Sequence, residues 1–368
     1  MNQLTDGNKR IADRQHGKPS EEPQGSNTLI QSSERAITVS VIMPARNAED
    51  CIATALNALF SSTYSRYEVI VVDDGSTDRT PEICSEYPCR VISVEWQGIG
   101  SAENVGAAHA EGEILYFTDA DVIVPPDALE RVVKTLTDHR EVVALSGVYG
   151  EETPPKDFFS QYKNMLHRYV HRSNSKYTTN LFGANSAIWT HIFRDIGGFR
   201  SSQRTLEDVE LGYRLIAAGH RILMAKDIEV MHCKQYNFWA LIRSDVVNRA
   251  IPWTVIMLRH RHLHLDLNTR PRNLLSMLAV WSTLFTFLPV NVLYNSLWFF
   301  SCTCLFCFCN LGLLRAMYKH KGFWFALGAG FYTFFSYFYQ AVGVFLGVVK
   351  YLGMPSEDRK VPTPHTTR

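Results

Sequence analysis

The sequence predicts an α/β protein in which a parallel sheet is covered by helices and is followed by C-terminal transmembrane helices. Short apolar runs alternate with helix-like segments in the first third of the chain. Two of these runs end in paired acids, at the edge where open α/β sheets bind ligands. Residues 273–314 and 322–349 contain no Asp, Glu, Lys, Arg or His, which is typical of segments inside a bilayer.

Length and charge bound the possible functions. The 368 residues leave room for two domains. The formal net charge of +1 offers no basic excess to neutralise phosphates, so no nucleic-acid partner is expected. Residues 1–36 are polar and lack the apolar segment of a signal peptide, so we expect a disordered tail there and a cytosolic domain after it.

Four predicted strands alternate with three predicted helices after this tail. In chain order they are a strand at 37–43, a helix at 48–59 capped by Asn47, a strand at 68–72, a helix that starts through Pro81 after a Ser76 or Thr77 cap, a strand at 90–94, a helix at 102–110 and a strand at 114–117. The strands are almost continuously apolar, the pattern of strands that are buried on both faces. We therefore expect a parallel sheet with a helix layer on each side.

Acidic residues follow two of these strands. Asp119 and Asp121 are spaced i, i+2, so on an extended chain they point to the same side and can converge on one hard divalent cation. A plain surface loop is the alternative for this pair. Asp73 and Asp74 end the second strand, where a carboxylate can accept a base N–H or a sugar hydroxyl; a turn with a helix cap is the alternative there.

Five segments, in order and at the right spacing, resemble the family 2 glycosyltransferases. They are Val39–Asn47, Val71–Asp78, Thr118–Asp121, Gly197–Phe199 and Glu207–Leu215. The resemblance extends from residue 37 to about residue 232. It implies a Rossmann-like nucleotide-sugar-binding domain of the GT-A fold, placed at 37–235, and transfer of a sugar with inversion from a nucleotide diphosphate sugar.

The resemblance also implies roles for individual residues on the donor side. Donor contacts are expected from Pro44, Ala45, Asp73, Asp74 and Asp119. Asp121, together with Asp119, is expected to bind Mg²⁺ or Mn²⁺, which would offset the charge that develops on the departing nucleoside diphosphate. His232 ends a predicted strand where some relatives place a histidine near the metal, and a structural histidine is the alternative.

The catalytic base is expected at the start of a later helix. Glu207 and Asp208 open this helix, where negative residues suit the helix dipole without any catalytic role. By the resemblance, Asp208 matches the base that takes the proton of the acceptor hydroxyl, and Glu207 supports it or contacts the acceptor. The loop 182–187 matches the acceptor side, where Gly183 leaves room for a sugar and Asn185 can hydrogen-bond it; a plain strand turn is the alternative.

The chain departs from the family pattern in two places. Relatives commonly carry Ala-Arg-Asn-X-Gly where this chain has Glu103 in place of the arginine, which puts donor contacts from that helix in question. Processive relatives carry Gln-X-X-Arg-Trp, whereas Arg249 and Trp253 stand here at a different spacing. These two residues still offer a cation for a diphosphate and an aromatic ring for an acceptor sugar. The spacing itself argues against processive synthesis.

The end of the chain is expected to associate with a membrane. Residues 236–272 predict an interfacial amphipathic helix and a basic collar. The collar is expected to hold anionic headgroups or a lipid pyrophosphate, with a simple topology signal as the alternative. Its residues are Arg259, His260, Arg261, His262, His264, Arg270 and Arg272. The uncharged run 273–314 would be about 63 Å long as one helix, so it must turn, and Pro289 is the obvious place. With 322–349, we expect three spans in 273–350 and a tail at 351–368 outside the cytosol. Two spans and a re-entrant hairpin are the alternative.

The cysteines separate into two groups. Those before residue 272 are expected to be free thiols in a reducing compartment. Those of the apolar run fan around a helix and are expected to pack as small apolar residues, with a metal cluster as the less favoured alternative: they are Cys302, Cys304, Cys307 and Cys309.

The sequence thus predicts a membrane-anchored, non-processive, inverting glycosyltransferase with a cytosolic catalytic domain. The expected partners are a nucleotide diphosphate sugar, a lipid or lipid-linked acceptor, and the membrane. A polysaccharide synthase subunit and a catalytically inactive membrane assembly factor are the alternatives. The presence of all four acids Asp74, Asp119, Asp121 and Asp208 argues against an inactive protein.

Overall fold

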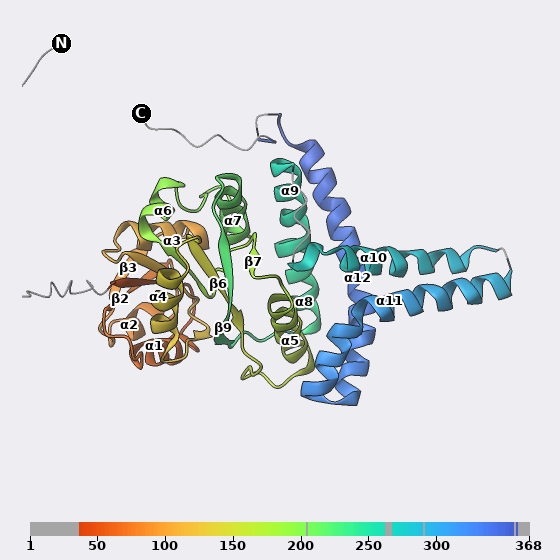
Figure 1. Ribbon diagram of the computed structural model, residues 1–368, viewed down its shortest axis with the longest axis horizontal. Helices are drawn as coiled ribbons and strands as arrows, with labels where there is room; N and C mark the ends of the chain where they lie inside the picture. Colours follow the sequence, from red (N-terminus) through yellow and green to blue (C-terminus); the bar gives the residue numbers. More distant parts are fainter. Residues whose placement is uncertain (1–36, 204, 262–266, 290, 357, 360–368) are drawn as a thin grey trace, which may run out of the picture. The chain divides into compact units, whose positions relative to one another are not determined.

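The computed structural model describes residues 37–203, 205–261, 267–289, 291–356 and 358–359. Its strands form a nine-stranded mixed sheet in the order β3-β2-β1-β4-β8-β6-β9-β5, with β7 paired to β9 (Figure 1). The strands are β1 Val39–Ala45, β2 Tyr67–Asp74, β3 Arg90–Val94, β4 Ile114–Phe117, β5 Val122–Ile123, β6 Ala144–Tyr149, β7 Tyr177–Thr178, β8 Ser186–Trp189 and β9 Ile222–His232.

The first half of the sheet confirms the predicted parallel arrangement. Strands β2 and β4 both pair with β1 in parallel, and β3 pairs with β2 in parallel. The acids that follow β2 and β4 therefore emerge at the same edge. The second half is mixed, because β8 runs antiparallel to β4 and β6 while β9 runs parallel to β6.

Helices cover both faces of the sheet, as Figure 1 shows. They are α1 Ile52–Phe60, α2 Thr80–Cys84, α3 Ile99–Ala108, α4 Ala128–Asp138, α5 Phe158–Arg172, α6 Thr190–Asp195 and α7 Glu207–Ala217. Alternate residues of β1 enter opposite cores. Val41 and Met43 pack in one core with Leu56 of α1, while Ile42 packs in the other with Leu211 of α7, and all five side chains are fully buried.

Two predicted helix starts are wrong by several residues. Helix α1 begins at Ile52 because Asn47 has a left-handed backbone (φ 48°), and its side-chain oxygen accepts a hydrogen bond from the Thr77 N–H at 2.8 Å. Asn47 thus joins two loops and caps no helix. Helix α3 begins earlier than predicted, at Ile99, because Gly98 (φ 97°) allows the chain to turn directly into it.

Apolar helices follow the sheet domain. They are α8 Phe238–Asp245, a π-helical segment Val246–Ala250, α9 Ile251–His260, α10 Pro271–Ser282 with a 3₁₀ extension Thr283–Phe287, α11 Val292–Lys321 and α12 Phe323–Gly353. The uncharged run turns where predicted, and Asn291 caps α11 by accepting a hydrogen bond from the Leu293 N–H at 2.9 Å. In the described part of the chain, two helices, α11 and α12, are long and apolar enough to cross a membrane by length and composition.

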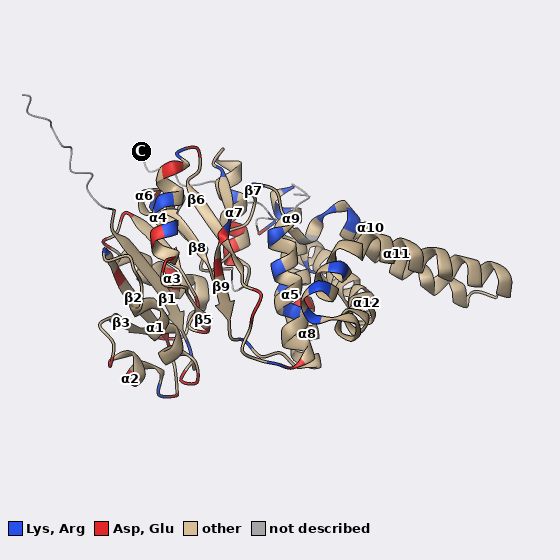
Figure 2. Cartoon of the chain, turned by 60° about the horizontal axis from the view of Figure 1, so that its bottom comes forward, with Lys and Arg blue, Asp and Glu red and all other residues tan. Residues whose placement is uncertain are grey.

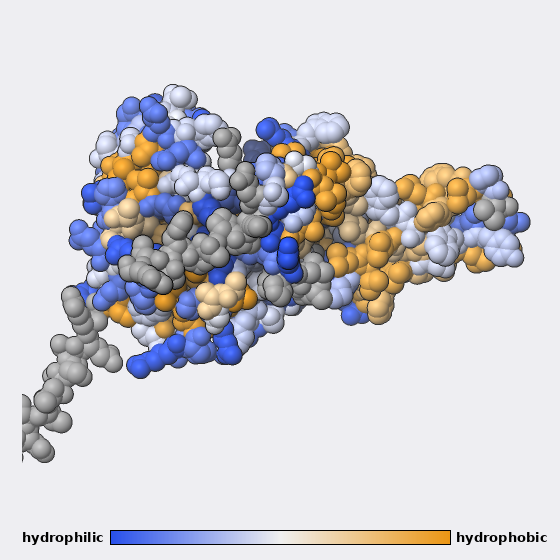
Figure 3. Space-filling model, turned by 90° about the horizontal axis from the view of Figure 1, so that it is seen from above, coloured by the Kyte–Doolittle hydropathy of each residue, from blue (hydrophilic) through white to orange (hydrophobic). Residues whose placement is uncertain are grey.

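The surface of these helices matches a lipid environment. Large apolar side chains are exposed on them, including Phe308 (76%), Trp324 (80%) and Phe331 (72%). Hydrophobic residues cover much of this part of the molecule in Figure 3. Lys and Arg lie on α5, on the α8–α9 segment and at the start of α10, whereas the projecting part of the α10–α11 hairpin shows no charged colour in Figure 2. Exposed apolar surface of this extent marks a site of contact with a membrane or with another protein.

Helix α12 packs on α5 of the sheet domain and on α8 and α9, which follow that domain. Near its start, the Phe325 ring lies 5.2 Å from the Phe158 ring of α5. Further along, the Tyr339 hydroxyl donates to Asp245 of α8 at 2.9 Å. At its end, the Arg259 guanidinium of α9 lies 3.7 Å from the Met354 sulfur. The start of α12 therefore contacts the sheet domain, and its end contacts α9 of the segment that follows the sheet domain.

In the described part of the chain, two arginines of the basic collar contact the sheet domain. Arg270 donates to the Ser173 hydroxyl at 2.9 Å and to the Asn174 side chain at 2.8 Å, both at the end of α5. Arg272 stacks over the Tyr169 ring at 5.3 Å. These contacts join the collar to the sheet domain. His262 and His264, also predicted there, lie outside the described residues.

The cysteines of α11 face different sides of the helix. Cys302 is buried, whereas Cys304 and Cys307 are exposed. Their sulfur atoms therefore do not share one site, in agreement with packing as small apolar residues.

Candidate functional site

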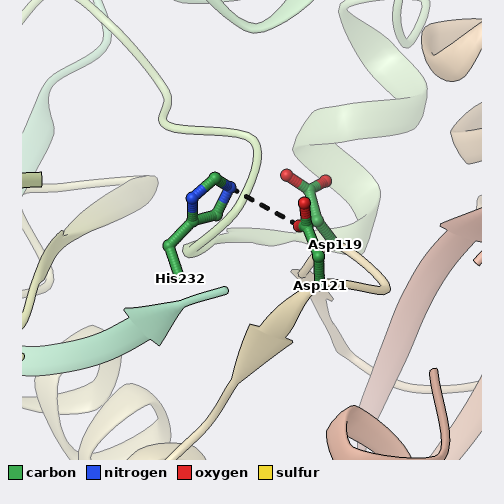
Figure 4. Close-up of side chains that lie close together, drawn as sticks. All are labelled: Asp119, Asp121 and His232. Atoms are coloured by element: carbon green, nitrogen blue, oxygen red, sulfur yellow. Dashed lines mark ion pairs between the residues drawn. The ribbon is translucent and has the colours of Figure 1, made fainter. Parts of the chain in front are cut away.

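Strand pairing brings Asp119, Asp121 and His232 together (Figure 4). Both acids follow β4, and the short strand β5 then pairs antiparallel with β9 so that Val122 lies opposite His232. One ligand atom from each of the three side chains lies within 4.8 Å of the other two, and the His232 Nε2 is 3.5 Å from the Asp121 Oδ1. Two carboxylates and one imidazole are suitable ligands for a divalent cation.

The electrostatics of this group fit a cation. Burial and the neighbouring Asp121 carboxylate raise the pKa of Asp119 to about 7. Burial lowers the pKa of His232 to about 4, so its imidazole is neutral at pH 7 and keeps a lone pair for coordination. A divalent cation would stabilise both ionised carboxylates and accept that lone pair.

A cleft of about 320 Å³ opens beside β1 and β2 on the nucleotide half of the sheet. Its lining includes the predicted donor residues Pro44, Ala45 and Asp74. The Asp74 carboxylate accepts hydrogen bonds from the N–H groups of Gln97 at 2.8 Å and Gly98 at 3.0 Å. Asp74 therefore shapes the cleft wall by fixing the loop that leads into α3.

Asp73 does not line this cleft. It is buried, and its Oδ1 accepts a hydrogen bond from the Ser76 N–H at 3.1 Å, which closes the turn after β2. The turn alternative thus describes Asp73 better than a donor contact does. The expected donor role of this pair rests on Asp74.

Sequence reasoning missed two residues of the cleft, Arg46 and Trp96. The Arg46 guanidinium lies 4.8 Å from the centre of the Trp96 ring, and both residues line the cleft. Trp96 is 55% exposed, which is unusual for a tryptophan and leaves ring surface available for a planar ligand. The only available signal was an aromatic residue in a polar loop after the third predicted strand.

Asp208 is held at the first turn of α7 by backbone donors. The Gly183 N–H donates to its Oδ2 at 3.1 Å, and the Val209 N–H donates to its Oδ1 at 2.8 Å. Burial raises the pKa of Asp208, and these two hydrogen bonds oppose that rise. Leu206, just before the helix, has a left-handed backbone (φ 59°), an uncommon conformation for a branched residue and one found at functional sites.

Arg249 and Trp253 share a cavity with Asp208. Arg249 lies in the π-helical segment and Trp253 lies on α9, which continues it. Residues four apart lie on one helix face, so the spacing that differs from Gln-X-X-Arg-Trp still brings both side chains to the acceptor side. Single π turns inside helices often occur at functional sites.

The structure gives Asn185 internal partners in place of the expected acceptor contact. Its side chain is fully buried and completely used: its oxygen accepts from the Tyr116 hydroxyl at 3.0 Å, and its Nδ2 donates to the carbonyl of Ile228 at 3.0 Å. Asn185 therefore cross-links β4, β8 and β9 inside the core. Gly183 of the same loop does reach the acceptor side, through its hydrogen bond to Asp208.

Glu103 lies beside Glu207 and is not among the residues that line the donor cleft. The two side chains are 1% and 7% exposed, and each has a carboxylate oxygen without a hydrogen-bond partner among the described residues. Burial and the Glu207 charge raise the pKa of Glu103 well above its ordinary value, and burial together with Asp208 raises the pKa of Glu207 to about 8. At neutral pH Glu207 therefore holds its proton, and the pKa of the neighbouring Glu103 is shifted in the same direction.

Replacing Glu103 with Gln is expected to raise the unfolding temperature by a few degrees at pH 8 and to change it little at pH 5. Because folding raises these pKa values, the protonated pair contributes its full stability at a pH below about 4.5, the ordinary pKa of a glutamate. This contribution is lost as the pH rises through about 8, the pKa of Glu207 in the folded protein. Thermal unfolding in EDTA at both pH values measures this. The exposed Glu86→Gln is the control, and equal shifts in the two variants would contradict the prediction.

The matches to a family model and to curated relatives are matches to glycosyltransferases. Residues 40–202 match the family model described as Glycosyl transferase family 2. Glycosyltransferase AglE of Haloferax volcanii is 33% identical over 208 residues, which cover 53% of this chain and 66% of AglE. Poly(ribitol-phosphate) beta-N-acetylglucosaminyltransferase TarS of Staphylococcus aureus is 31% identical over 130 residues, 32% of this chain and 23% of TarS. The chain spans less than two thirds of the length of these curated relatives.

A solved structure shows the same fold. The mannosyltransferase PcManGT from Pyrobaculum calidifontis, in complex with GDP-Man and Mn²⁺, matches with a TM-score of 0.51 over 86% of this chain and 87% of that chain. The sequence identity is 20%, so the likeness concerns the fold. It confirms the GT-A architecture that the sequence predicted.

Proposed function

Because the chain belongs to the family 2 glycosyltransferases, we propose that it transfers one sugar, with inversion, from a nucleotide diphosphate sugar to a lipid or lipid-linked acceptor. The observation that carries the proposal is the arrangement of three parts at one sheet edge: the Asp74 cleft, the Asp119–Asp121–His232 group and the Asp208 cavity. They offer a place for a nucleoside, a place for its diphosphate and a place for an acceptor.

On the donor side, Asp74 fixes the cleft and Trp96 offers a ring face to the base. Asp119, Asp121 and His232 would hold Mg²⁺ or Mn²⁺, as the complex of PcManGT with GDP-Man and Mn²⁺ supports. Such a cation, when bound, neutralises the charge that develops on the leaving diphosphate. Its site at the carboxyl ends of the strands is the usual place for a nucleotide in open α/β sheets.

On the acceptor side, Asp208 accepts the proton of the acceptor hydroxyl. The hydroxyl oxygen then attacks the anomeric carbon from the face opposite the diphosphate, and the bond to the diphosphate breaks. The backbone N–H groups of Gly183 and Val209 orient the Asp208 carboxylate for this step. Product anomeric configuration, measured by NMR on the isolated product, tests the mechanism: inversion supports it, and retention would overturn it.

Replacing Trp96 with Ala is expected to weaken nucleotide binding. Stacking of a base on an aromatic ring contributes about 1–3 kcal/mol, or about 5- to 150-fold in affinity. Calorimetric titration of UDP and of GDP into the purified protein with Mg²⁺ measures the change. Trp239→Ala is the matched control, because Trp239 is exposed on α8 and does not line the cleft. Equal affinities of the two variants would exclude stacking on Trp96.

The proposal of a lipid acceptor is supported by the apolar helices that contribute residues to the acceptor cavity or pack beside it. Arg249 and Trp253 come from the α8–α9 region, against which α12 packs closely at Gly343 and Gly347. An added Cβ at Gly347 would lie 2.6 Å from the Thr254 Cβ, so the two helices approach as near as their backbones allow. We propose a catalytic domain at 37–235, an interfacial segment at 236–272, membrane helices at 273–350 and a tail at 351–368.

A reporter fused after residue 368 is expected to remain on the same side of the membrane as the catalytic domain. The start of α12 packs on α5 of the catalytic domain and its end packs on α9 of the adjoining interfacial segment, which favours this topology over the three spans that the charge pattern predicted. A second reporter at the α10–α11 turn, after Pro289, is the control and is expected to be translocated. A translocated reporter at residue 368 would support three spans.

A further inference from the structure

Four buried side-chain nitrogens line the cavity beside Asp208 and have no hydrogen-bond partner among the residues that the structure describes. They are His167 Nε2, His171 Nδ1, Asn180 Nδ2 and Trp253 Nε1. None of these side chains is more than 9% exposed. Buried nitrogens without partners cost free energy, so such a set in one cavity of about 70 Å³ points to a ligand that accepts hydrogen bonds.

Two of these donors are rigidly placed. His167 and His171 lie one turn apart on α5, with ring centres 6.2 Å apart and planes inclined by 7°. The Tyr149 ring contacts them at 5.6 Å and 6.3 Å, and it also contacts His232 of the metal-binding group at 4.9 Å. Tyr149 therefore connects the cavity to the metal-binding group, and neither group shares a residue with the other.

The cavity offers an anion one cationic group and several neutral N–H donors. The Arg249 guanidinium lines it and makes no ion pair or hydrogen bond within the described ranges. Burial and Arg249 lower the pKa of both histidines, that of His171 to about 3, so each ring is neutral at pH 7 and carries one N–H. The carboxylate of Asp208 is already bound by two backbone N–H groups. Neutral N–H donors thus surround one guanidinium, whose positive charge also opposes the burial-driven rise in the pKa of Asp208 across the same cavity.

We propose that this cavity binds the phosphate group of the acceptor. A phosphate offers several oxygens to the guanidinium fork of Arg249 and to the neutral N–H donors of the histidine, asparagine and tryptophan side chains. The proposal rests on the proposed function and narrows the acceptor to a phosphorylated molecule. Asp208 lies in the same cavity, so an acceptor held by its phosphate would present a nearby hydroxyl to the base.

The donor diphosphate is the other source of phosphate in this reaction. The cavity and the donor cleft have no lining residue in common, and the donor diphosphate already has the Asp119–Asp121–His232 group. Arg249 and Trp253 come from the helices that pack against α12, the side from which a lipid would approach. These observations favour the acceptor as the source.

The test is titration of inorganic phosphate into the full-length protein in detergent, in EDTA so that no cation holds the phosphate. Saturable binding to the wild type is expected. Arg249→Met is expected to weaken it at least tenfold, and His167→Gln, which keeps a side chain of similar length, severalfold. Arg243→Met is the matched control, because Arg243 is exposed on α8 and does not line the cavity. Thermal unfolding of each variant verifies that it is folded.

Three outcomes would overturn the proposal: no phosphate binding by the wild type, equal binding by Arg249→Met and Arg243→Met, or displacement of phosphate by UDP or GDP. Displacement would assign the cavity to the donor. Phosphate affinity that is unchanged in the presence of a bound nucleotide supports the acceptor. Failure here is distinct from failure of the proposed function: if phosphate does not bind but Asp208→Asn still abolishes transfer, the glycosyltransferase mechanism stands and only the phosphorylated acceptor is excluded.

Discussion

Asp121→Asn is expected to lower the transfer rate by about 10²- to 10³-fold, because a catalytic cation supplies several kcal/mol of charge stabilisation. The substitution keeps the shape of the side chain but removes the charge that lies 3.5 Å from the His232 ring. Asp119 and His232 would remain as ligands, so we expect weaker binding of Mn²⁺ and partial recovery of activity at high Mn²⁺. Initial rates over a Mn²⁺ titration measure both effects.

The matched control for this prediction is Asp138→Asn. Asp138 is exposed at the end of α4 and pairs with Lys134 at the surface, so its loss should leave the rate unchanged. Full wild-type activity in EDTA, after removal of bound metal, would exclude a catalytic cation at this group.

Asp208→Asn is expected to reduce kcat by about 10²-fold or more while nucleotide affinity stays near normal. The amide cannot take the proton of the acceptor hydroxyl, but the residues of the donor cleft do not contact this position. Asp74→Asn is expected to do the opposite. It would weaken the hydrogen bonds that hold the Gln97–Gly98 loop and so lower donor affinity.

Calorimetric titration of UDP and GDP into both variants, next to a transfer assay, separates these effects. A loss of nucleotide affinity in Asp208→Asn as large as in Asp74→Asn, or an unchanged turnover, would show that Asp208 is not the base. The pH dependence gives a second check. Because burial raises the pKa of Asp208 and the base must be ionised, the wild-type rate should increase as pH rises through that pKa.

The strands and the acid pairs could be predicted because each depends on a short stretch of sequence. Apolar runs placed β1 to β4, and the positions of Asp74, Asp121 and Asp208 followed from motifs with fixed spacing. His232 was ambiguous because its role depends on the pairing of β5 with β9, a contact across more than a hundred residues of sequence. The internal partners of Asn185 were not predicted for a similar reason, since only the packed sheet shows that its amide is already satisfied.

The acceptor side was less predictable because it is assembled from distant segments. His167 and His171 lie on a helix whose sequence carries no motif, and they meet Arg249 only when the π-helical segment packs beside α5 and α7. The membrane region shows the same limit. Hydropathy placed the turn before α11, but the side on which α12 lies depends on contacts such as Tyr339 with Asp245, which composition does not reveal.

The most direct test of the central claim is the fate of a labelled sugar. Membranes that contain the wild-type protein, Asp121→Asn or Asp208→Asn are incubated with a panel of labelled nucleotide sugars, and lipid-soluble, polymeric and free label are separated. We expect one donor to give metal-dependent label in the lipid fraction with the wild type and almost none with either variant. Label that appears only as free sugar or only in polymer, or that is equal in all three samples, would contradict transfer to a lipid acceptor by this site.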